Sequence, residues 1–468
     1  MAISKVIDRT GNVLIDLTED TVSENDVVLG KTFHDRNGNS KTGTLLTANV
    51  TPIIDYNNLV RFFDYDGTIV WSGTILEANA LSALPVAPDH TSDNLTFDGW
   101  NYTLTDVQNT LKSMDIGAIY KTTDGCSYFP IQLTSDSVSI TLKITTGITY
   151  NIDWGDGTTD NNLSHTYAQK GKYTIKVDSN NVNYAIISRL LNSNTNLANM
   201  VSTVKLSSNV TSISGDAFNG CCNMRYIIIP NSVTYVGTYM FVNNYTLKHI
   251  NIPNSITNIP TYSFNKCYSL KNVSIPNSVT SISSYAFGSC SSLQCVNIPN
   301  SVTNIYSYAF QNCYNLKNIT MSNSVIFIDR DAFTSCYSLE YISIPYGITT
   351  LSGELLFRCY NITTFNIPRS VTQIDTYAFQ DCYNLKNIAI PNSVATINSN
   401  AFQGCSSIEY FDFSTHETPP TLASTGTLGY DYTRRFKIII PAGSYSQYEA
   451  ATNWSALCAL GLVEEASA

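Results

Sequence analysis

Charge and catalytic signatures are scarce in this chain of 468 residues. Only 13% of its residues are charged, and it has five His. The sequence contains no phosphate-binding glycine loop, no His-Glu-x-x-His pair, no dinucleotide fingerprint and no serine elbow. We therefore expect no catalytic residues, no metal site and no cofactor, and we do not expect an enzyme. No apolar run reaches the roughly 18 residues of a membrane span, so we do not expect insertion into a membrane.

Basic stripes are also missing. Residues 1–206 carry 14 Lys and Arg against 22 Asp and Glu, whereas residues 207–413 carry nine of each. An acidic first part and a neutral middle provide no basic surface that could bind a phosphate backbone, so nucleic acid is not an expected partner.

The chain ends show no export or anchoring signal. Met1–Thr10 lack the apolar core and cleavage site of a secretory signal, and Glu464–Ala468 lack a lipidation or wall-anchor motif. We expect the product to stay in the cell or to leave by another route, such as lysis.

What the chain has in abundance is repetition. Nine copies of a 23-residue unit fill residues 207–413. Phe recurs at 218, 241, 264, 287, 310, 333, 379 and 402, with Leu356 in the remaining slot, and a Cys follows three residues later in eight of the nine copies. Such a period predicts a solenoid, in which each coil packs on its neighbours and long surfaces are presented for binding.

The Cys ladder has three interpretations. The first is buried packing by a small apolar side chain, which we favour. Disulfides between neighbouring coils are the second. The third, a metal site, is disfavoured because the sequence has no Cys-x-x-Cys pair or suitably spaced His.

Residues 368–390 show how one repeat makes one coil. Val371 and Ile374 precede a polar turn, and Leu385, Ile388 and Ile390 end in the alternation of a strand with one buried face. A Pro closes the strand because it has no N–H to give to a ladder. Stacked coils then place these strands side by side as a parallel sheet.

The repeat resembles a known family. Ile275–Pro299 (IPNSVTSISSYAFGSCSSLQCVNIP) is similar to the BspA-like class of leucine-rich repeats, and all nine units match its pattern. The resemblance implies a curved solenoid used for adhesion or recognition.

The side chains that flank the central apolar residue of each strand form the candidate binding row. We expect the ligand contacts among Tyr226, His249, Asn251, Asn272, Asn297, Asn318, Tyr341, Asn366, Asn387, Tyr410 and Asp412. This row is polar and almost uncharged, and a solvated sheet face without a ligand is the alternative. Two further Tyr stripes, one before the Phe ladder and one after the Cys ladder, either contact a ligand through rigid rings or stack between coils.

Small β modules are expected before the solenoid. Residues 1–50 resemble an attachment module of phage and prophage tail proteins, carried by Leu14–Thr18 and by Gly30–Asp35. Residues 51–120 resemble the β-grasp repeats of bacterial surface proteins, with Phe97–Trp100 (FDGW) as the matching motif. Asp66-Gly67 predicts a hairpin, and Val107–Ile119 is the one segment of residues 51–120 expected to be helical.

Residues 121–180 resemble a polycystic-kidney-disease (PKD) domain, an immunoglobulin-like β-sandwich. Trp154–Thr158 (WGDGT), His165–Tyr167 (HTY) and Gly171–Tyr173 (GKY) carry the resemblance in order. The acidic residues near Trp154 do not have the spacing of an EF-hand loop, so we expect them to form turns.

The solenoid, with an N-terminal cap, is expected over residues 181–413, and a C-terminal cap over 414–468. In the cap, Ser444 with Gln447 predicts a capping box at the start of a helix, and Trp454 is expected to cover the open end of the core. The expected fold is thus mainly β: nine leucine-rich-repeat coils preceded by small β domains.

These features predict a non-enzymatic recognition protein. The leading hypothesis is a phage or prophage tail-associated protein, located on the virion, that binds a host-surface glycan or protein through its solenoid and other tail proteins through residues 1–120. The alternatives are a bacterial surface adhesin of the same fold and an inert spacer. A homo-oligomer is compatible with all three.

Overall fold

The computed structural model describes the backbone of residues 5–7, 13–16, 32–34, 40–42, 59–110, 113–191, 201–429 and 436–466. The chain divides into two compact units, Met1–Asn58 and Leu59–Ala468. In the first unit, β1 (Lys5–Ile7) pairs with β2 (Val13–Asp16), and β3 (Thr32–His34) pairs with β4 (Ser40–Thr42), both antiparallel. The rest of the expected attachment module lies outside the described residues.

Residues 59–122 form a small mixed sheet with two short helices, which we call the docking module. Its elements are β5 (Leu59–Phe63), β6 (Ile69–Thr74), α1 (Ile75–Asn79), η2 (Thr91–Asp93), β7 (Leu95–Trp100), α2 (Leu104–Gln108) and β8 (Met114–Thr122). The sheet order is β6-β5-β8-β7, with the central pair parallel and both outer pairs antiparallel. The predicted hairpin at Asp66-Gly67 is confirmed, and Gly67 has the positive φ of +84° that such a turn needs.

The helix predicted over Val107–Ile119 is wrong. Only Leu104–Gln108 is helical, and Met114–Thr122 is a strand. Eight of the nine residues of β8 are buried, so the strand lacks the alternation of apolar and polar residues by which a half-buried strand is recognised.

Residues 127–191 form a β-sandwich whose two sheets continue into the solenoid. The strands are β9 (Ser127–Leu133), β10 (Val138–Ile144), β11 (Asn151–Asp153), β12 (Thr159–Asp160), β13 (Ser164–Tyr167), β14 (Gly171–Asp178) and β15 (Tyr184–Leu191). One sheet has the order β13-β10-β15-β17-β19, and the other β12-β11-β14-β9-β16-β18. The sandwich therefore covers the apolar N-terminal end of the solenoid, and both belong to one hydrophobic core.

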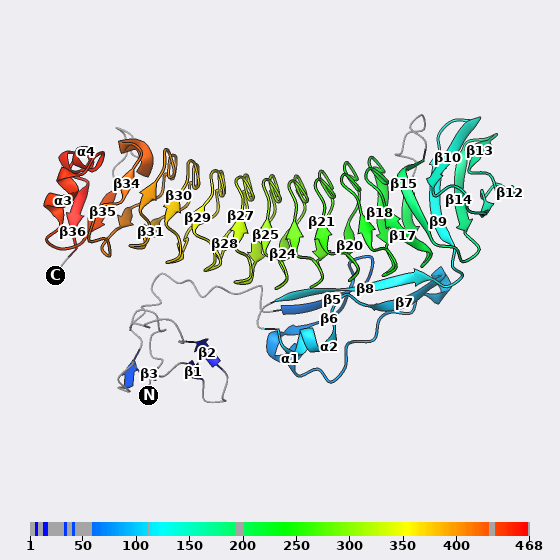
Figure 1. The fold of residues 1–468 in the computed structure, drawn as a ribbon, viewed down its shortest axis with the longest axis horizontal. Coiled ribbons are helices and arrows are strands. Elements are labelled where there is room, and N and C mark those ends of the chain that lie inside the picture. The colour runs from blue at the N-terminus through cyan, green and yellow to red at the C-terminus, as the bar shows by residue number, and fades with distance from the viewer. Residues whose placement is uncertain are drawn as a thin grey trace. The chain divides into compact units, whose positions relative to one another are not determined.

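The solenoid has two ladders of short parallel strands (Figure 1). The strand ladder that carries the predicted binding row comprises β16 (Val201–Lys205), β18 (Asn223–Ile228), β20 (His249–Asn251), β22 (Asn272–Ser274), β24 (Cys295–Asn297), β26 (Asn318–Thr320), β28 (Tyr341–Ile342), β31 (Asn387–Ala389), β33 (Tyr410–Asp412), β35 (Lys437–Ile440) and β36 (Val463–Glu465). The second ladder comprises β17 (Val210–Ile213), β19 (Tyr235–Val236), β21 (Asn258–Ile259), β23 (Ser281–Ile282), β25 (Asn304–Ile305), β27 (Phe327–Ile328), β29 (Thr350–Leu351), β30 (Gln373–Ile374), β32 (Thr396–Ile397) and β34 (Thr421–Leu422). With a further coil at each end of the nine repeats, the solenoid has about 11 turns.

The Phe and Cys ladders lie in the core, as predicted. Phe264 and Phe287 stack with ring centroids 5.2 Å apart and planes 5° from parallel, so they occupy adjacent coils. All twelve cysteines are free thiols, which excludes the disulfide interpretation. The thiols of the ladder also donate to a carbonyl of the previous coil: Cys290 Sγ donates to Phe264 O over 3.2 Å, and Cys313 Sγ to Phe287 O over 3.2 Å.

Each coil turns sharply through two residues in the left-handed conformation. In one repeat these are Tyr285 (φ 57°) and Ser289 (φ 61°), and neither is a glycine. Their N–H groups donate to Ser307 O and Gln311 O of the next coil, over 3.1 and 2.6 Å. These bonds between coils compensate for the strain of placing non-glycine residues there.

The C-terminal end is closed by α3 (Tyr445–Ala450) and α4 (Trp454–Ala459). Trp454 is fully buried, and its ring centroid lies 5.1 Å from that of Phe413. A helix does follow Ser444, but the predicted capping box is wrong because the Ser444 hydroxyl donates to Pro441 O instead.

Candidate functional site

The predicted binding row lies along one ladder of coils in the expected register, and the hydrogen bonding divides this ladder into several separate sheets. His249 pairs with Asn272, Asn318 with Tyr341, and Asn387 with Tyr410. The residue between the two flanking positions is buried in each strand, as Ile250 and Phe411 show. The flanking side chains therefore point away from the core, as the alternation predicted.

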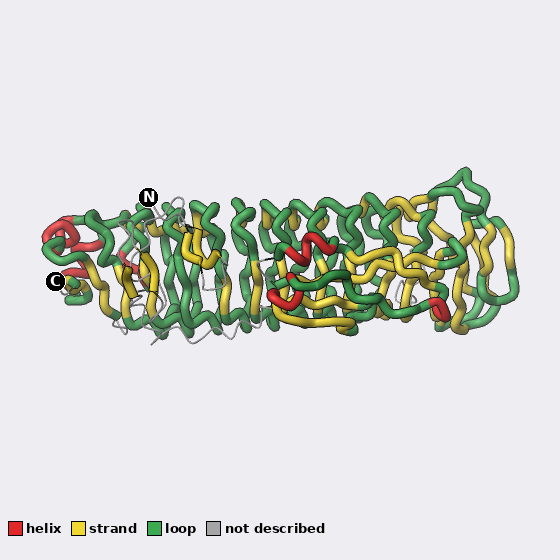
Figure 2. Tube along the Cα trace, turned by 90° about the horizontal axis from the view of Figure 1, so that it is seen from below, coloured by secondary structure: helices red, strands yellow, loops and turns green. Residues whose placement is uncertain are grey.

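The docking module covers the first part of this row. β8 runs beside β18, β20 and β22 (Figures 1 and 2). Asn251 Nδ2 donates to Ala118 O over 2.9 Å, Asn101 Nδ2 donates to Ser274 Oγ over 2.8 Å, and the Tyr102 hydroxyl donates to Ile275 O over 2.6 Å. The first of these buried bonds occupies the amide of Asn251, which the sequence analysis assigned to a ligand.

The row residue His249 is enclosed by the module. Its ring centroid lies 5.4 Å from that of Phe63, and its Nε2 donates to Asn251 Oδ1 over 2.6 Å. Burial lowers the pKa of His249 to about 4, so the ring is neutral at neutral pH. Glycine allows the docking module to pack this closely on the strand ladder, because a Cβ at Gly117 would overlap the Asn251 side chain.

A partly buried ion pair lies at the edge of the zone that the docking module covers. Arg61 donates to both carboxylate oxygens of Asp115, over 2.8 and 2.9 Å, and also contacts Cys295 Sγ at 3.1 Å. Burial raises the pKa of the Asp115 carboxyl, while Arg61 and a hydrogen bond with Asn297 act in the opposite direction. Asn297 is thus the last row residue bound to the module.

Beyond Asn297 the row is open to solvent on the docking-module side. Within the described part of the chain, residues 59–122 form no hydrogen bond with the remaining predicted residues, which are half-buried or exposed: Asn318, Tyr341, Asn366, Asn387, Tyr410 and Asp412. We call these six residues the open row. Tyr226 is the first residue of the predicted row, at the end opposite to the open row. Its ring lies next to the Tyr65 ring of the docking module, with ring centroids 6.2 Å apart.

The two Tyr stripes stack between coils. Tyr262 and Tyr285 have ring centroids 4.5 Å apart, and Tyr337 and Tyr360 have centroids 4.7 Å apart, with planes within 8° of parallel in both pairs. The ring faces are therefore used by neighbouring coils, and the edges and hydroxyls are what a ligand could contact.

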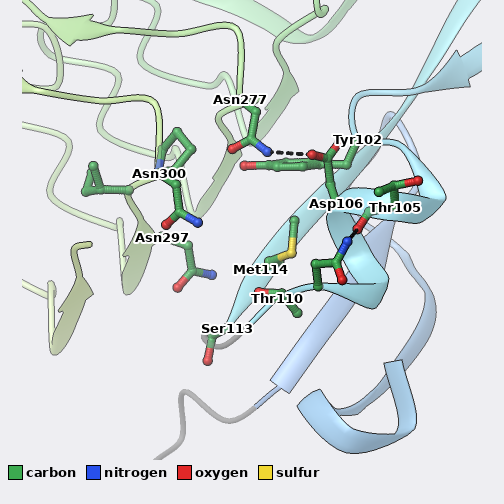
Figure 3. A pocket seen from close by; sticks show the side chains of 12 residues that line it. Tyr102, Thr105, Asp106, Thr110, Ser113, Met114, Asn277, Asn297 and Asn300 are labelled. Carbon is green, nitrogen blue, oxygen red and sulfur yellow. Dashed lines mark hydrogen bonds between the residues drawn. The ribbon is translucent and has the colours of Figure 1, made fainter. Parts of the chain in front are cut away.

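A cleft of about 170 Å³ lies where the module meets the solenoid (Figure 3). Sequence reasoning missed it because its two walls are about 170 residues apart along the chain. Asn277 Nδ2 donates to Asp106 Oδ1 across it over 3.0 Å. Figure 3 shows Asn277, Asn297 and Asn300 of the solenoid facing Tyr102 and Met114 of the module.

The acidic residues of the sandwich serve its turns. Asp153 accepts from Gly155 N over 2.9 Å, Asp156 pairs with His165 at 2.8 Å, and Asp160 accepts from Trp154 Nε1 over 3.2 Å. Among the described residues, no three His, Cys, Asp or Glu side chains gather as a metal site would require.

A family model for the BspA type leucine rich repeat region matches residues 192–317 and 303–419. The solenoid belongs to the BspA-type leucine-rich repeat family. Proteins built on such repeats are generally binding proteins, and nothing in the described residues points to catalysis. Nor does any helix in the described part of the chain have the length and apolar character needed to cross a membrane.

The chain is similar to several solved leucine-rich repeat structures. A leucine rich cell surface protein from Faecalibacterium prausnitzii A2-165 is 24% identical, with 48% of this chain and 82% of that chain covered and a TM-score of 0.27. A leucine-rich repeat protein from Bacteroides ovatus is 20% identical, with 62% and 98% covered and a TM-score of 0.29. The pneumococcal vaccine antigen PcpA is 15% identical, with 57% and 78% covered and a TM-score of 0.35. No curated protein matches the chain.

Proposed function

We propose that this BspA-type protein is a non-enzymatic recognition protein that binds a surface glycan or protein through the open row. The proposal rests on one observation: the docking module covers the first part of the strand ladder and leaves the rest uncovered. The docking module buries His249, Asn251 and Ser274, whereas the row beyond Asn297 keeps its polar side chains available on that side.

The chemistry of the open row favours a neutral partner. It offers three amides and two phenols, and Asp412 is its one carboxylate. Amides both donate and accept hydrogen bonds, and Tyr rings add contact area at low entropic cost. Hydroxyl-rich sugars and neutral protein surfaces fit this inventory better than anionic polymers.

Two settings suit such a binder. We favour attachment to a phage or prophage tail through the N-terminal part of the chain, because residues 1–50 resemble tail attachment modules. A bacterial surface adhesin uses the same solenoid in the same way, and the BspA-type repeat supports it equally. The partner of residues 1–58 separates the two: co-purification with tail proteins supports the first setting, and retention on the producing cell supports the second.

The experiment measures binding of the full chain to cell walls prepared from Gram-positive gut bacteria. Replacing Tyr341 and Tyr410 together by Ala should weaken binding at least about tenfold, and binding should change little with salt because no charge pair carries it. Tyr383→Ala, an exposed Tyr of the stacked stripe, is the matched control. Unchanged binding by the double variant, or a collapse of binding with salt, would overturn the proposal.

A further inference from the structure

The cleft between α2 and the solenoid has two walls that are held together by the fold. The module wall consists of Tyr102, Ser113 and Met114 with residues of α2, and the solenoid wall consists of Asn277, Asn300 and the backbone around Pro299. The hydrogen bond from Asn277 to Asp106 ties the walls together, and the Tyr102 hydroxyl is anchored on Ile275 O. The cleft therefore exists in the folded unit before any ligand arrives.

One polar group inside this cleft has no partner. Ser113 is 4% exposed, and its Oγ forms no hydrogen bond within the described structure. A buried hydroxyl without a partner is destabilising unless something else satisfies it. Ser113 lines the cleft, but its Oγ is itself inaccessible, so the other lining side chains are the ones that a ligand would contact.

The remaining lining defines the class of ligand. Asn277 Oδ1 accepts no hydrogen bond among the described residues, and Asn300 presents an exposed amide at the mouth of the cleft. No Lys or Arg is among the described lining residues, and Asp106 is the one carboxylate. Amides and hydroxyls beside the apolar surfaces of Tyr102 and Met114 suit a neutral ring with polar edges and C–H faces, and they disfavour an anion.

The size is that of a small ligand. About 170 Å³ is below the roughly 300–1,000 Å³ of sites for drug-sized molecules and several times the ~30 Å³ that one water occupies. We propose that this cleft binds a single ring of a neutral sugar, as a site separate from the open row.

The test is saturation-transfer NMR with the full chain. The probes are the methyl glycosides of glucose, galactose and N-acetylglucosamine, with glucuronic acid as the charged comparison. We expect saturation of at least one neutral glycoside and none of glucuronic acid. Asn300→Trp should abolish the signal by filling the mouth of the cleft.

The repeat supplies a matched control. Asn392 follows Pro391 as Asn300 follows Pro299, and it is exposed on a coil that the docking module does not reach. Asn392→Trp should leave the sugar signal unchanged.

Three outcomes would overturn the cleft proposal: no transfer from any neutral glycoside, an Asn300→Trp variant that binds as well as the parent, or a preference for glucuronic acid. The double variant Tyr341→Ala, Tyr410→Ala should keep the sugar signal. That readout separates failure of the cleft from failure of the open row.

Discussion

At the scale of single residues, the repeat positions combine packing with hydrogen bonding between coils. Phe310 is fully buried, with ring centroids 5.4 Å from Phe287 and 5.7 Å from Phe333. Seven of the eight ladder thiols, from Cys267 to Cys405, donate to a carbonyl one coil back, which explains why Cys recurs where another small apolar residue would also fill the space.

The central Phe gives the first prediction. Phe310→Ala should lower the free energy of unfolding by about 3–5 kcal/mol, because the lost ring leaves a cavity between two coils. Urea unfolding followed by circular dichroism measures it. Tyr314→Ala is the control, because Tyr314 belongs to the same repeat and is 39% exposed. It should lower the free energy of unfolding far less. A loss below about 1 kcal/mol for Phe310→Ala would show that the ring is not part of the core.

The thiol ladder gives a prediction on pH. Burial raises the pKa of Cys313 from 9.0 to about 12. The folded state therefore keeps its proton where the unfolded chain loses it, so stability is complete below pH 9 and falls as the pH rises toward about 12. Urea unfolding across that window should show a smaller decline for Cys313→Ala than for the parent.

Accessibility of the same thiols provides the independent check. The native protein should react slowly with a thiol reagent at Cys290, Cys313 and Cys336, which are fully buried, and rapidly after denaturation. Fast labelling of the native protein at these positions would contradict the buried ladder.

At the scale of elements, the main finding is how β8 meets the strand ladder. This strand belongs to the sheet of the docking module and also packs on β20 and β22 of the solenoid. Two glycines make room for side chains at the contact: Gly117 lies against Asn251, and Gly67 lies against His249.

The contact makes a prediction about Gly117. Gly117→Ala should destabilise docking by about 1–3 kcal/mol, because the added methyl overlaps the Asn251 side chain in a packed interface. Hydrogen exchange should then quicken in β8 and β20 but stay unchanged in β31 and β33. Equal exchange in the parent and Gly117→Ala would show that the module does not press on this strand.

At the scale of the whole molecule, periodicity explains what could be predicted. A 23-residue period forces equivalent residues into register, so Phe264 next to Phe287 followed from the sequence alone. No repeat in the sequence indicated where the docking module packs on the solenoid. Asn101 and Tyr102 contact residues more than 150 positions away, and these contacts depend on shape and on buried polar groups rather than on any repeat. The covering of half the predicted row, and the cleft beside it, were therefore visible only in the folded chain.

The open row is the central claim, and hydroxyl-radical footprinting tests it most directly. The full chain is oxidised with and without bound cell-wall material, and Tyr oxidation is measured by mass spectrometry. Tyr341 and Tyr410 should be oxidised in the free protein and protected in the complex, while Tyr235, which is 59% exposed on the second ladder, should react equally in both. Protection of Tyr235 with no change at Tyr341 and Tyr410 would contradict the account.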